Sequence, residues 1–413
     1  MVKRVVVTGI GMISPLGNNK EEVLDGIRNS RCAVDKITLY DTSDRLVKLA
    51  AEVKDYDPDE FFDKREQRRL DRVNQFGIIA GRRALEDAGL TREYLSKERA
   101  GVYVASGIGG IQTIENEHAR GENRGFDKVS PYFIPMAIVN LTAGNIAIDI
   151  KAHGSCQALV TACASASNAV GEAYRHIKDG YADIMFAGGS EAAITELSIG
   201  GFTSMKALCT STDPDRASIP FDKDRSGFVM GEGATILVLE ELEHALARNA
   251  NILAEIAGYS DTCDANHITS PCENGEYAAL AMTQAIESAG IKPGDIDYIN
   301  AHGTSTPIND KYETTAIKRA FGEGYKDVLV SSSKSQIGHL LGASGSTELA
   351  MSIYAMNEGI VPPTINYVNP DEDCDLNLVV NKPIEADVKY ILKNSLGFGG
   401  HNASVVLKRW ENK

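Results

Sequence analysis

The feature that most constrains the fold is a short pattern that occurs twice in the chain. Gly231 to Leu239 and Gly400 to Leu407 each combine glycine, small residues and an apolar run of strand type. Elsewhere, apolar runs of strand length alternate with segments of helical periodicity. This alternation predicts α/β layers with buried sheets, and the second occurrence of the pattern suggests an internal duplication. The same offset would place the region of Lys334 on that of Cys163.

The expected strands fall into two groups along the chain. They are predicted at residues 5–8, 102–106, 183–187 and 234–239 in the first group, and at 252–256, 296–299 and 328–330 in the second. A helical segment at 240–248 separates the groups and ends near Asn249. We therefore expect a first half of residues 1–250 and a second half of residues 251–413, in keeping with a length that is large for one core.

The glycines that follow the first strand do not make a convincing nucleotide-binding loop. Gly9 and Gly11 begin a GxGxxG-like spacing, but Ser14 stands at its third glycine position. Pro15 follows where a helix should already be running, so a turn is the expected structure here.

Two polar segments carry most of the noticeable charge of the first half. Residues 65–90 are predicted to form one long amphipathic helix with Arg65, Arg68, Arg69 and Arg72 on one face. A solvated charged face is the ordinary explanation for such a cluster, although the cluster stands out in an acidic chain. Residues 115–128, rich in glycine and charge, are expected to form a loop.

The composition limits the classes of function that need to be considered. The 413 residues carry a formal net charge of −15, which argues against nucleic acid or an anionic membrane as the principal partner. Seven scattered cysteines without a CxxC pair favour a reducing compartment without a disulfide framework or zinc site. No apolar run approaches the roughly 20 residues that span a bilayer, and the N-terminal run is too short for a signal peptide. We expect a soluble, cytoplasmic protein.

Cys163 is the strongest candidate for a nucleophile. It ends a short apolar run and precedes a helical pattern of Ala166, Ala169, Val170, Ala173 and Ile177, with Gly180 as a stop signal. The amide hydrogens and dipole at a helix start favour a thiolate, and the small residues around the cysteine leave room for a substrate. A lone cysteine is more often a buried core residue, so the assignment depends on other motifs.

Two histidine motifs lie far downstream of this cysteine. His302 directly follows a predicted strand and is succeeded by glycine and hydroxyl residues, which places it at a cleft. His339 follows Lys334 in the segment SSSKSQIGH, which leads into a small-residue helix that contains Glu348. Near the C-terminus, Phe398 lies between glycines in a flexible loop. Each motif alone has an ordinary structural explanation.

Taken together, these motifs resemble the β-ketoacyl-acyl-carrier-protein synthases of the thiolase superfamily, and among them the type II elongating synthases (synthase II) of bacterial fatty-acid synthesis. The matching segments are TACAS at 161–165, AHGTST at 301–306, KS with GH at 334–339 and GFGG at 397–400, in the family's order. The resemblance covers essentially the whole chain. It implies a thiolase-like fold in which duplicated αβαβα halves form a five-layer sandwich. It also implies decarboxylative condensation of malonyl-carrier protein with an acyl chain held on Cys163.

The resemblance assigns a role to each residue of the site. His302 and His339 would donate hydrogen bonds to the enolate. Lys334 would set the local electrostatic field and the histidine protonation state, with Glu348 as its ionic counterpart. The backbone amides of Cys163 and Phe398 would form an oxyanion hole. Which histidine assists decarboxylation is left open. The residues expected to bind substrate are Thr304 and Thr306 on the pantetheine arm, and Ile108, Phe133 and Phe202 along the acyl tunnel.

The resemblance also implies partners. The expected docking residues for an acidic acyl carrier protein are Arg65, Arg68, Arg69, Lys128 and Lys206. Asp127 departs from the family, because a basic residue is usual there, and so does the segment Ala166-Ser167-Asn168. A homodimer is implied, with Phe133 near the partner's tunnel. No cofactor is expected beyond the carrier's phosphopantetheine, and no metal is required, although a monovalent cation near Asn309, Glu348 and Ser395 would fit the family.

Several alternatives to a type II elongating synthase remain open. A thiolase would need a second cysteine where Phe398 stands, and initiating synthases use Cys-His-Asn instead of Cys-His-His. A type I elongating synthase or a polyketide ketosynthase fits the same motifs. A non-catalytic partner that binds carrier protein and sets chain length would lack the nucleophile, and a Cys-His hydrolase would leave Lys334 without a role.

Overall fold

The computed structural model describes residues 3–411, whose strands form one ten-stranded sheet built from two half-sheets. The first half-sheet has the order β5 (Cys156–Gln157), β4 (Ala100–Ala105), β6 (Ile184–Glu191), β7 (Gly233–Glu241), β1 (Val5–Ile13). The second has the order β8 (Ala254–Cys263), β14 (His401–Arg409), β13 (Tyr390–Gly397), β9 (Tyr298–Asn300), β10 (Leu329–Ser331). The half-sheets join where β1 pairs with β8, from Val5 opposite Ile256 to Val7 opposite Ala254.

The two half-sheets have the same pattern of strand directions, which confirms the predicted duplication. In the first, β4 is parallel to β5 and β6, and β7 is antiparallel to β6 and β1. In the second, β9 is parallel to β10 and β13, and β14 is antiparallel to β13 and β8. Strands β7 and β14, which carry the repeated glycine-led pattern, occupy equivalent positions.

The duplication aligns the chain with a different offset from the predicted one. A 3-10 turn at Ala162–Ala164 leads into α8 (Ser165–Lys178), and a matching 3-10 turn at Leu341–Ala343 leads into α14 (Ser344–Asn357). Both turns begin at a residue with positive φ, 49° at Ala162 and 47° at Leu341. Cys163 therefore corresponds to Gly342 and not to the region of Lys334.

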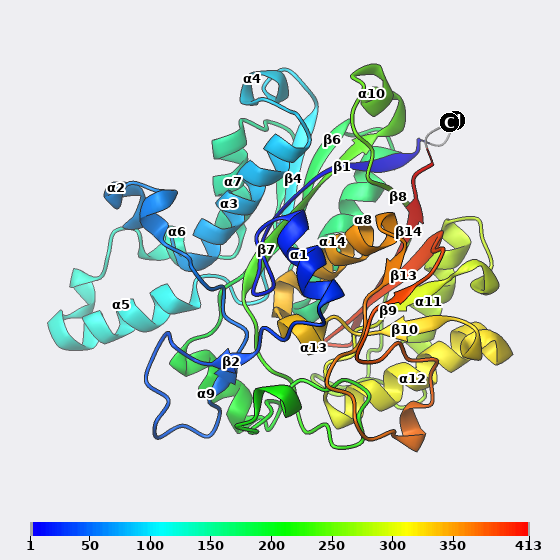
Figure 1. Ribbon diagram of the computed structural model, residues 1–413. Helices are drawn as coiled ribbons and strands as arrows, with labels where there is room; N and C mark the ends of the chain where they lie inside the picture. The colour runs from blue at the N-terminus through cyan, green and yellow to red at the C-terminus, as the bar shows by residue number, and fades with distance from the viewer. Residues whose placement is uncertain (1–2, 412–413) are drawn as a thin grey trace.

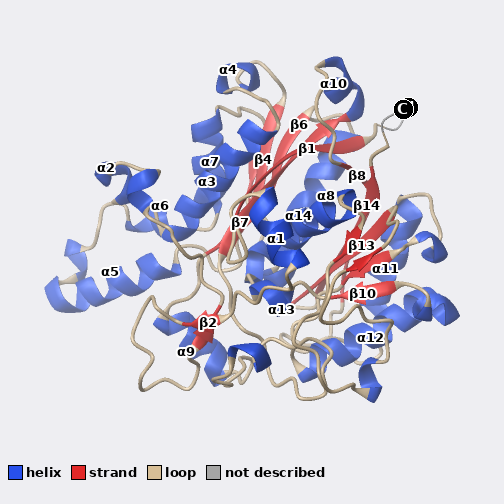
Figure 2. Ribbon diagram, in the orientation of Figure 1, coloured by secondary structure: helices blue, strands red, loops and turns tan. Residues whose placement is uncertain are grey.

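The helices complete a five-layer sandwich (Figures 1 and 2). Helices α8 and α14 lie between the half-sheets, where α8 contacts both β6 and β14. Helices α3 (Arg72–Asp87) and α7 (Asn140–Ile150) cover the outer face of the first half-sheet, while α11 (Glu276–Ser288) and α12 (Pro307–Phe321) cover that of the second. The thiolase-like arrangement expected from the resemblance is confirmed. The division at residues 250 and 251 stays a prediction.

The remaining helices lie around these layers. They are α1 (Lys20–Arg28), α2 (Lys64–Gln67), α4 (Arg92–Leu95), α5 (Ile111–Arg124), α6 (Phe133–Ala137), α9 (Glu196–Ser204), α10 (Leu242–Ala247) and α13 (Lys334–Ile337). Two small two-stranded sheets lie outside the main sheet, and they pair β2 (Asp35–Lys36) with β3 (Leu49–Ala50) and β11 (Ile360–Val361) with β12 (Ile384–Glu385).

The N-terminal glycines belong to a strand and not to the predicted turn. Strand β1 continues through Gly9 and Gly11 to Ile13 and packs against α3. A Cβ atom at Gly11 would lie 2.0 Å from the carbonyl oxygen of Ala80, and one at Gly9 would lie 2.7 Å from that of Ala84. These glycines therefore allow a helix to approach the sheet closely, which explains a glycine-rich pattern without nucleotide binding.

Two secondary-structure predictions in the first half are wrong. The segment 65–90 is divided into α2 and α3 because the buried Asp71 caps the start of α3, where its carboxylate accepts the Val73 N–H. Arg72 consequently leaves the exposed arginine cluster and forms a buried ion pair with Glu232, with Nη2 and Oε1 2.6 Å apart. The predicted loop at 115–128 is instead mostly helix α5. The Phe126 ring packs against this helix at Gly121, where a Cβ atom would lie 2.5 Å from the ring.

The contact between β1 and α3 gives a prediction for stability. Replacing Gly11 by alanine should lower the free energy of unfolding by about 1–3 kcal/mol, because the new methyl group meets helix backbone that cannot move away alone. Urea denaturation followed by circular dichroism measures the change. Gly201→Ala in α9 is the matched control, since its Cβ would meet no atom within 4 Å. Equal denaturation midpoints for the two variants would contradict this account of the strand.

Candidate active site

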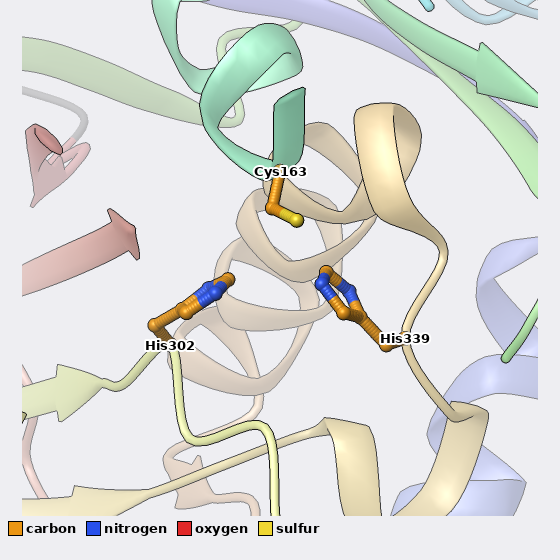
Figure 3. A group of neighbouring side chains, drawn as sticks. All are labelled: Cys163, His302 and His339. Atoms are coloured by element: carbon orange, nitrogen blue, oxygen red, sulfur yellow. The ribbon is translucent and has the colours of Figure 1, made fainter. Parts of the chain in front are cut away.

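Cys163, His302 and His339 meet at one point in the middle of the molecule. Figure 3 shows their side chains pointing toward one another from three separate segments. The cysteine sulfur and one ring nitrogen of each histidine all lie within 4.8 Å of one another. The two imidazole rings are nearly perpendicular, at 84°, with centroids 5.3 Å apart. The tertiary fold thus brings together the three residues that the sequence motifs singled out.

His302 is held by a buried carboxylate on the helix that follows it. Strand β9 ends at Asn300, and the chain then turns through His302 and Gly303 into α12. The backbone N–H groups of His302 and Gly303 each donate to Glu313, at 2.7 Å. Sequence reasoning missed Glu313, although its position within the helix directly after the histidine motif was a usable signal.

His339 is fixed by its backbone and by a serine at the start of α14. Its N–H donates to the carbonyl oxygen of Val229 at 2.7 Å, and its Nδ1 lies 2.8 Å from the Ser344 hydroxyl. The ring packs edge-on against Phe228, with centroids 5.2 Å apart. Its Nε2 is buried without a hydrogen-bond partner among residues 3–411. With Ser344 donating to Nδ1, the ring proton would lie on Nε2, on the side away from the serine.

Lys334 lies buried beside His302. Its ammonium donates to the His302 carbonyl oxygen at 2.7 Å and to Glu348 Oε1 at 2.5 Å, and it lies 3.5 Å from His302 Nδ1. Because an ammonium only donates, Nδ1 is the acceptor in that contact and the ring proton belongs on Nε2. The lysine therefore fixes both the position and the tautomer of the histidine.

Burial controls the protonation of all three residues. Burial, assisted by the positive charge of Lys334, holds the pKa of His302 and of His339 well below 6.5, so both rings are neutral at neutral pH. Burial also raises the pKa of Cys163 to about 12, although Lys334 opposes the shift. Backbone amides lower the pKa of the thiol, in the predicted direction, but burial outweighs them and the resting form is the thiol. The cost of burying the sulfur anion exceeds what nearby amides and the lysine return.

Two backbone amides face the sulfur. The pKa of the Cys163 thiol is lowered, against the larger effect of burial, by hydrogen bonding from the amides of Phe398 and of Cys163 itself. Strand β13 reaches this position because Gly397 has no side chain, and a Cβ there would lie 2.6 Å from the Thr161 carbonyl oxygen. The turn that follows uses positive φ at Gly399 and Gly400, which only glycine adopts without strain.

The three residues open into a cavity of about 430 Å³. Its lining includes the predicted substrate-binding residues Phe202, Thr304 and Thr306 but not Ile108 or Phe133. It also includes Lys206, Asn309 and Phe398, which were predicted for carrier docking, a cation and the oxyanion hole, respectively. The hydroxyl oxygens of Thr304 and Thr306 lie 2.9 Å apart on one wall. Ile108 and Phe202 belong to the same apolar cluster as Cys163. The site therefore has a polar wall and an apolar region that both reach the sulfur.

Comparisons with known proteins agree with this geometry. The model of the Beta-ketoacyl synthase N-terminal domain matches residues 2–245, and that of the Beta-ketoacyl synthase C-terminal domain matches residues 253–368. The chain belongs to the β-ketoacyl synthase family. Among curated relatives of this family, the 3-oxoacyl-[acyl-carrier-protein] synthase 2 of Staphylococcus aureus (strain COL) and that of Synechocystis sp. are each 47% identical, with 99% of both chains covered.

Solved structures of ketosynthases have the same fold as this family member. The ishigamide ketosynthase/chain length factor is 35% identical and superposes with a TM-score of 0.94, with both chains fully covered. A type II PKS acyl-carrier protein in complex with its ketosynthase bound to the hexaketide gives a TM-score of 0.92 at 32% identity, covering 99% of this chain and 100% of that chain.

Some predicted residues lie outside the cavity of this ketosynthase. Phe133 is half-buried on α6 and does not line the cavity. Arg65, Arg68 and Lys128 are exposed, while Arg69 is half-buried with its guanidinium 4.8 Å from the centre of the Tyr132 ring. None of these five residues lines the cavity that contains the Cys163 sulfur.

Sequence reasoning also missed a second buried carboxylate. Glu191, at the end of β6, accepts from the backbone amides of Gly107 at 2.7 Å and Gly342 at 3.0 Å, and from the Ser106 hydroxyl at 2.8 Å. It thereby ties the loop that carries Ile108 to the 3-10 turn before α14. Nothing in the local sequence marked Glu191, because its partners come from distant segments.

The burial of the two imidazoles predicts how they titrate. In nitrogen-15 NMR spectra of histidine-labelled protein, the ring nitrogens of His302 and His339 should keep the chemical shifts of neutral imidazole between about pH 7.5 and about pH 5.5. Histidine in a short unstructured peptide is the reference, and it titrates near pH 6.5. The unfolded chain binds more protons than the folded one below about pH 6.5, so these rings make stability fall as the pH falls. A mid-range titration of either ring near pH 6.5 would contradict the assignment.

Proposed function

We propose that the chain is a 3-oxoacyl-[acyl-carrier-protein] synthase that elongates fatty acids with malonyl-carrier protein. The observation that carries this proposal is the meeting of Cys163 with two neutral histidines in a cavity next to two backbone amides. The names of the relatives that are 47% identical over 99% of the chain support the same activity.

The first step transfers an acyl chain from a carrier protein to Cys163. The sulfur attacks the thioester carbonyl, the bond from that carbon to the carrier's sulfur breaks, and the thiol proton ends on the departing carrier thiol. The amides of Cys163 and Phe398 donate hydrogen bonds to the oxyanion that forms. Because the resting thiol is protonated, its proton must leave as the sulfur attacks, and the departing carrier sulfur takes it up.

The second step forms the carbon–carbon bond. Malonyl thioester loses carbon dioxide, and the electron pair remains as an enolate whose oxygen accepts hydrogen bonds from Nε2 of His302 and His339. The enolate carbon attacks the acyl carbonyl, the bond to Cys163 breaks, and the sulfur takes up a proton. Neutral rings suit this step, since a charged imidazolium would protonate the carbanion before it reacts. No cofactor is needed, because decarboxylation supplies the electron pair.

The walls of the cavity suit the two ends of an acyl-phosphopantetheine. The paired hydroxyls of Thr304 and Thr306 offer hydrogen bonds to the amides of the pantetheine arm. Ile108 and Phe202 pack in the same apolar cluster as Cys163, and Phe202 also lines the cavity, so these side chains suit the acyl chain. Phe398, between glycines, is placed to gate access to the sulfur.

We further propose that two copies of the chain form a homodimer in the cytoplasm, with Phe133 of each copy near the acyl path of the other. Large apolar side chains are exposed close to α6 and α7, as a self-association surface requires, and they are Ile134, Ile138, Ile148 and Val160. In this arrangement residues 1–250 and 251–413 act as one ketosynthase unit. The helices of residues 3–411 include none long and apolar enough to cross a membrane.

A polyketide ketosynthase is the second candidate, because a type II PKS ketosynthase shares the fold at 32% identity. The two activities differ in their products. A fatty-acid synthase stops after one condensation until the 3-oxo group is reduced, whereas a polyketide enzyme extends the unreduced product again. Mass spectrometry of carrier-bound products, formed from carriers of graded acyl length, separates the two and reports the preferred chain length.

The assignment of Cys163 is tested directly by substitution. Cys163→Ala should abolish condensation, because no thioester can form, and should leave the fold and carrier binding intact. The measurement is release of carbon dioxide and 3-oxoacyl product from malonyl-carrier protein and acyl-carrier protein. Cys156→Ala removes an exposed thiol and serves as the control. Continued elongation by Cys163→Ala would disprove the nucleophile, and a non-catalytic chain would show no difference between the variants.

The docking surface is tested by charge reversal. Replacing Arg65, Arg68 and Arg69 by glutamate should raise the KM for carrier-bound substrates by about tenfold or more while changing kcat little, because an acidic carrier is repelled before reaction. Short pantetheine thioesters should react with unchanged KM.

Reversal of exposed lysines on the second half provides the control for this variant. Lys326, Lys382 and Lys389 are exposed, so their replacement by glutamate makes the same change in net charge at a different surface. If both triple variants raise the KM for carrier-bound substrates equally, overall charge and not local docking is responsible.

A further inference from the structure

A second buried lysine shares the carboxylate that holds Lys334. Glu348 Oε1 lies 2.5 Å from the Lys334 ammonium, and Oε2 lies 2.8 Å from the ammonium of Lys393. The exposed fractions of the three side chains are 1%, 0% and 0%. Burying two ammonium groups that share one carboxylate is costly, so the second lysine calls for an explanation beyond that of Lys334.

The position of Lys393 ties it to the active site. It lies on β13 opposite Asn300 of β9, the strand that ends just before His302. Its ammonium also donates to the carbonyl oxygen of Asn394 and lies 3.4 Å from the Ser395 hydroxyl. Three oxygens therefore surround one ammonium behind the histidine, and the same strand continues to Phe398.

The residues beside Glu348 do not fit the monovalent cation that the family resemblance implies. Of the three predicted ligands, Glu348 and Ser395 contact the Lys393 ammonium instead. Asn309 lies at the start of α12 on the cavity wall, where its side-chain amide donates to Asp310 at 3.1 Å. A metal ion bound to Glu348 would lie next to the ammonium groups of Lys334 and Lys393. The repulsion between these positive charges in a buried, low-dielectric environment excludes the ion.

We propose that the Lys393 ammonium, covalently tethered to β13, takes the place of a monovalent cation at Glu348 and acts as a positioning residue for the condensation. It neutralises the second oxygen of Glu348, so that the first stays directed at Lys334 and Lys334 stays directed at His302. Burial lowers the pKa of Lys393 and the Glu348 carboxylate opposes this shift. The proposal rests on the proposed function only for its kinetic consequence, since occupancy of the site is a separate property.

Replacing the lysine with a small hydroxyl residue should create the missing cation site. Lys393→Ser opens a space lined by Glu348, the Asn394 carbonyl and Ser395, all of them oxygen ligands suited to an alkali ion. Crystals of this variant soaked in rubidium should show an anomalous-scattering peak beside Glu348, whereas crystals of the unmodified protein should show none. Lys389→Ser, which removes an exposed lysine just before β13, is the matched control.

Stability and rate provide a second measurement. When potassium is exchanged for tetramethylammonium at constant ionic strength, the Tm and condensation rate of the unmodified protein should not change. The rate of Lys393→Ser should fall by about tenfold or more in tetramethylammonium and recover in potassium. The loss should appear in kcat with little change in KM, because Lys393 does not contact the substrate.

Three results would overturn the proposal. They are a rubidium peak beside Glu348 in the unmodified protein, a potassium requirement of that protein, or a Lys393→Ser variant that binds no rubidium and keeps its full rate. If Lys393→Ser does not fold, Lys393→Gln keeps most of the side-chain volume and should lower kcat without recovery in potassium, so an unchanged kcat would again overturn the idea. The rubidium and Tm results do not depend on condensation, so failure of the proposed function would be seen separately.

Discussion

The close packing of two helices between two half-sheets determines everything else about this molecule. Helices α8 and α14 approach so closely that a Cβ atom at Gly345 would lie 2.2 Å from the Ser167 hydroxyl. Their preceding turns therefore lie side by side, and the neighbouring strands β9 and β13 of the second half-sheet bring His302 and Phe398 to the same place. Of the two equivalent turns, one carries Cys163 and the other carries Gly342, whose missing side chain lets the loop at Gly107 approach. The two halves thus share one backbone arrangement, and the different residues in their equivalent turns, Cys163 and Gly342, distinguish the site.

Burial of that centre explains the chemistry. It keeps the imidazoles neutral and the thiol protonated, and it makes each fixed charge act strongly over short distances. Lys334 and Lys393 counter this environment through the single carboxylate of Glu348. The consequence is an active site whose reactive groups are uncharged at rest and whose permanent charges lie behind them. This arrangement suits a condensing enzyme, because its carbanion-like intermediate must not be protonated before it attacks the acyl group.

The errors in reading the sequence have a common cause. The pattern of Gly9 and Gly11 was assigned to a turn, but close approach of α3 to β1 requires glycine in a strand. The segment 65–90 is predicted to be one helix, whereas α2 ends at Gln67 and buried Asp71 caps the start of α3. The polar segment at 115–128 was predicted as a loop, but most of it is helical. In each case a tertiary contact outweighed the local preference of the segment, since propensity is worth only a fraction of a kcal/mol per residue.

The sequence by itself determined the strands that alternate with helices, the duplication, the family and the identities of Cys163, His302, His339 and Lys334, because these depend on residue type and order along the chain. Only the tertiary structure decided which groups surround them. The partnership of Glu348 with Lys393 and the direction of every pKa shift depend on distances and burial. These quantities join residues far apart in the chain, and no local pattern records them, because the free energy of a buried charge is set by what the whole fold places around it.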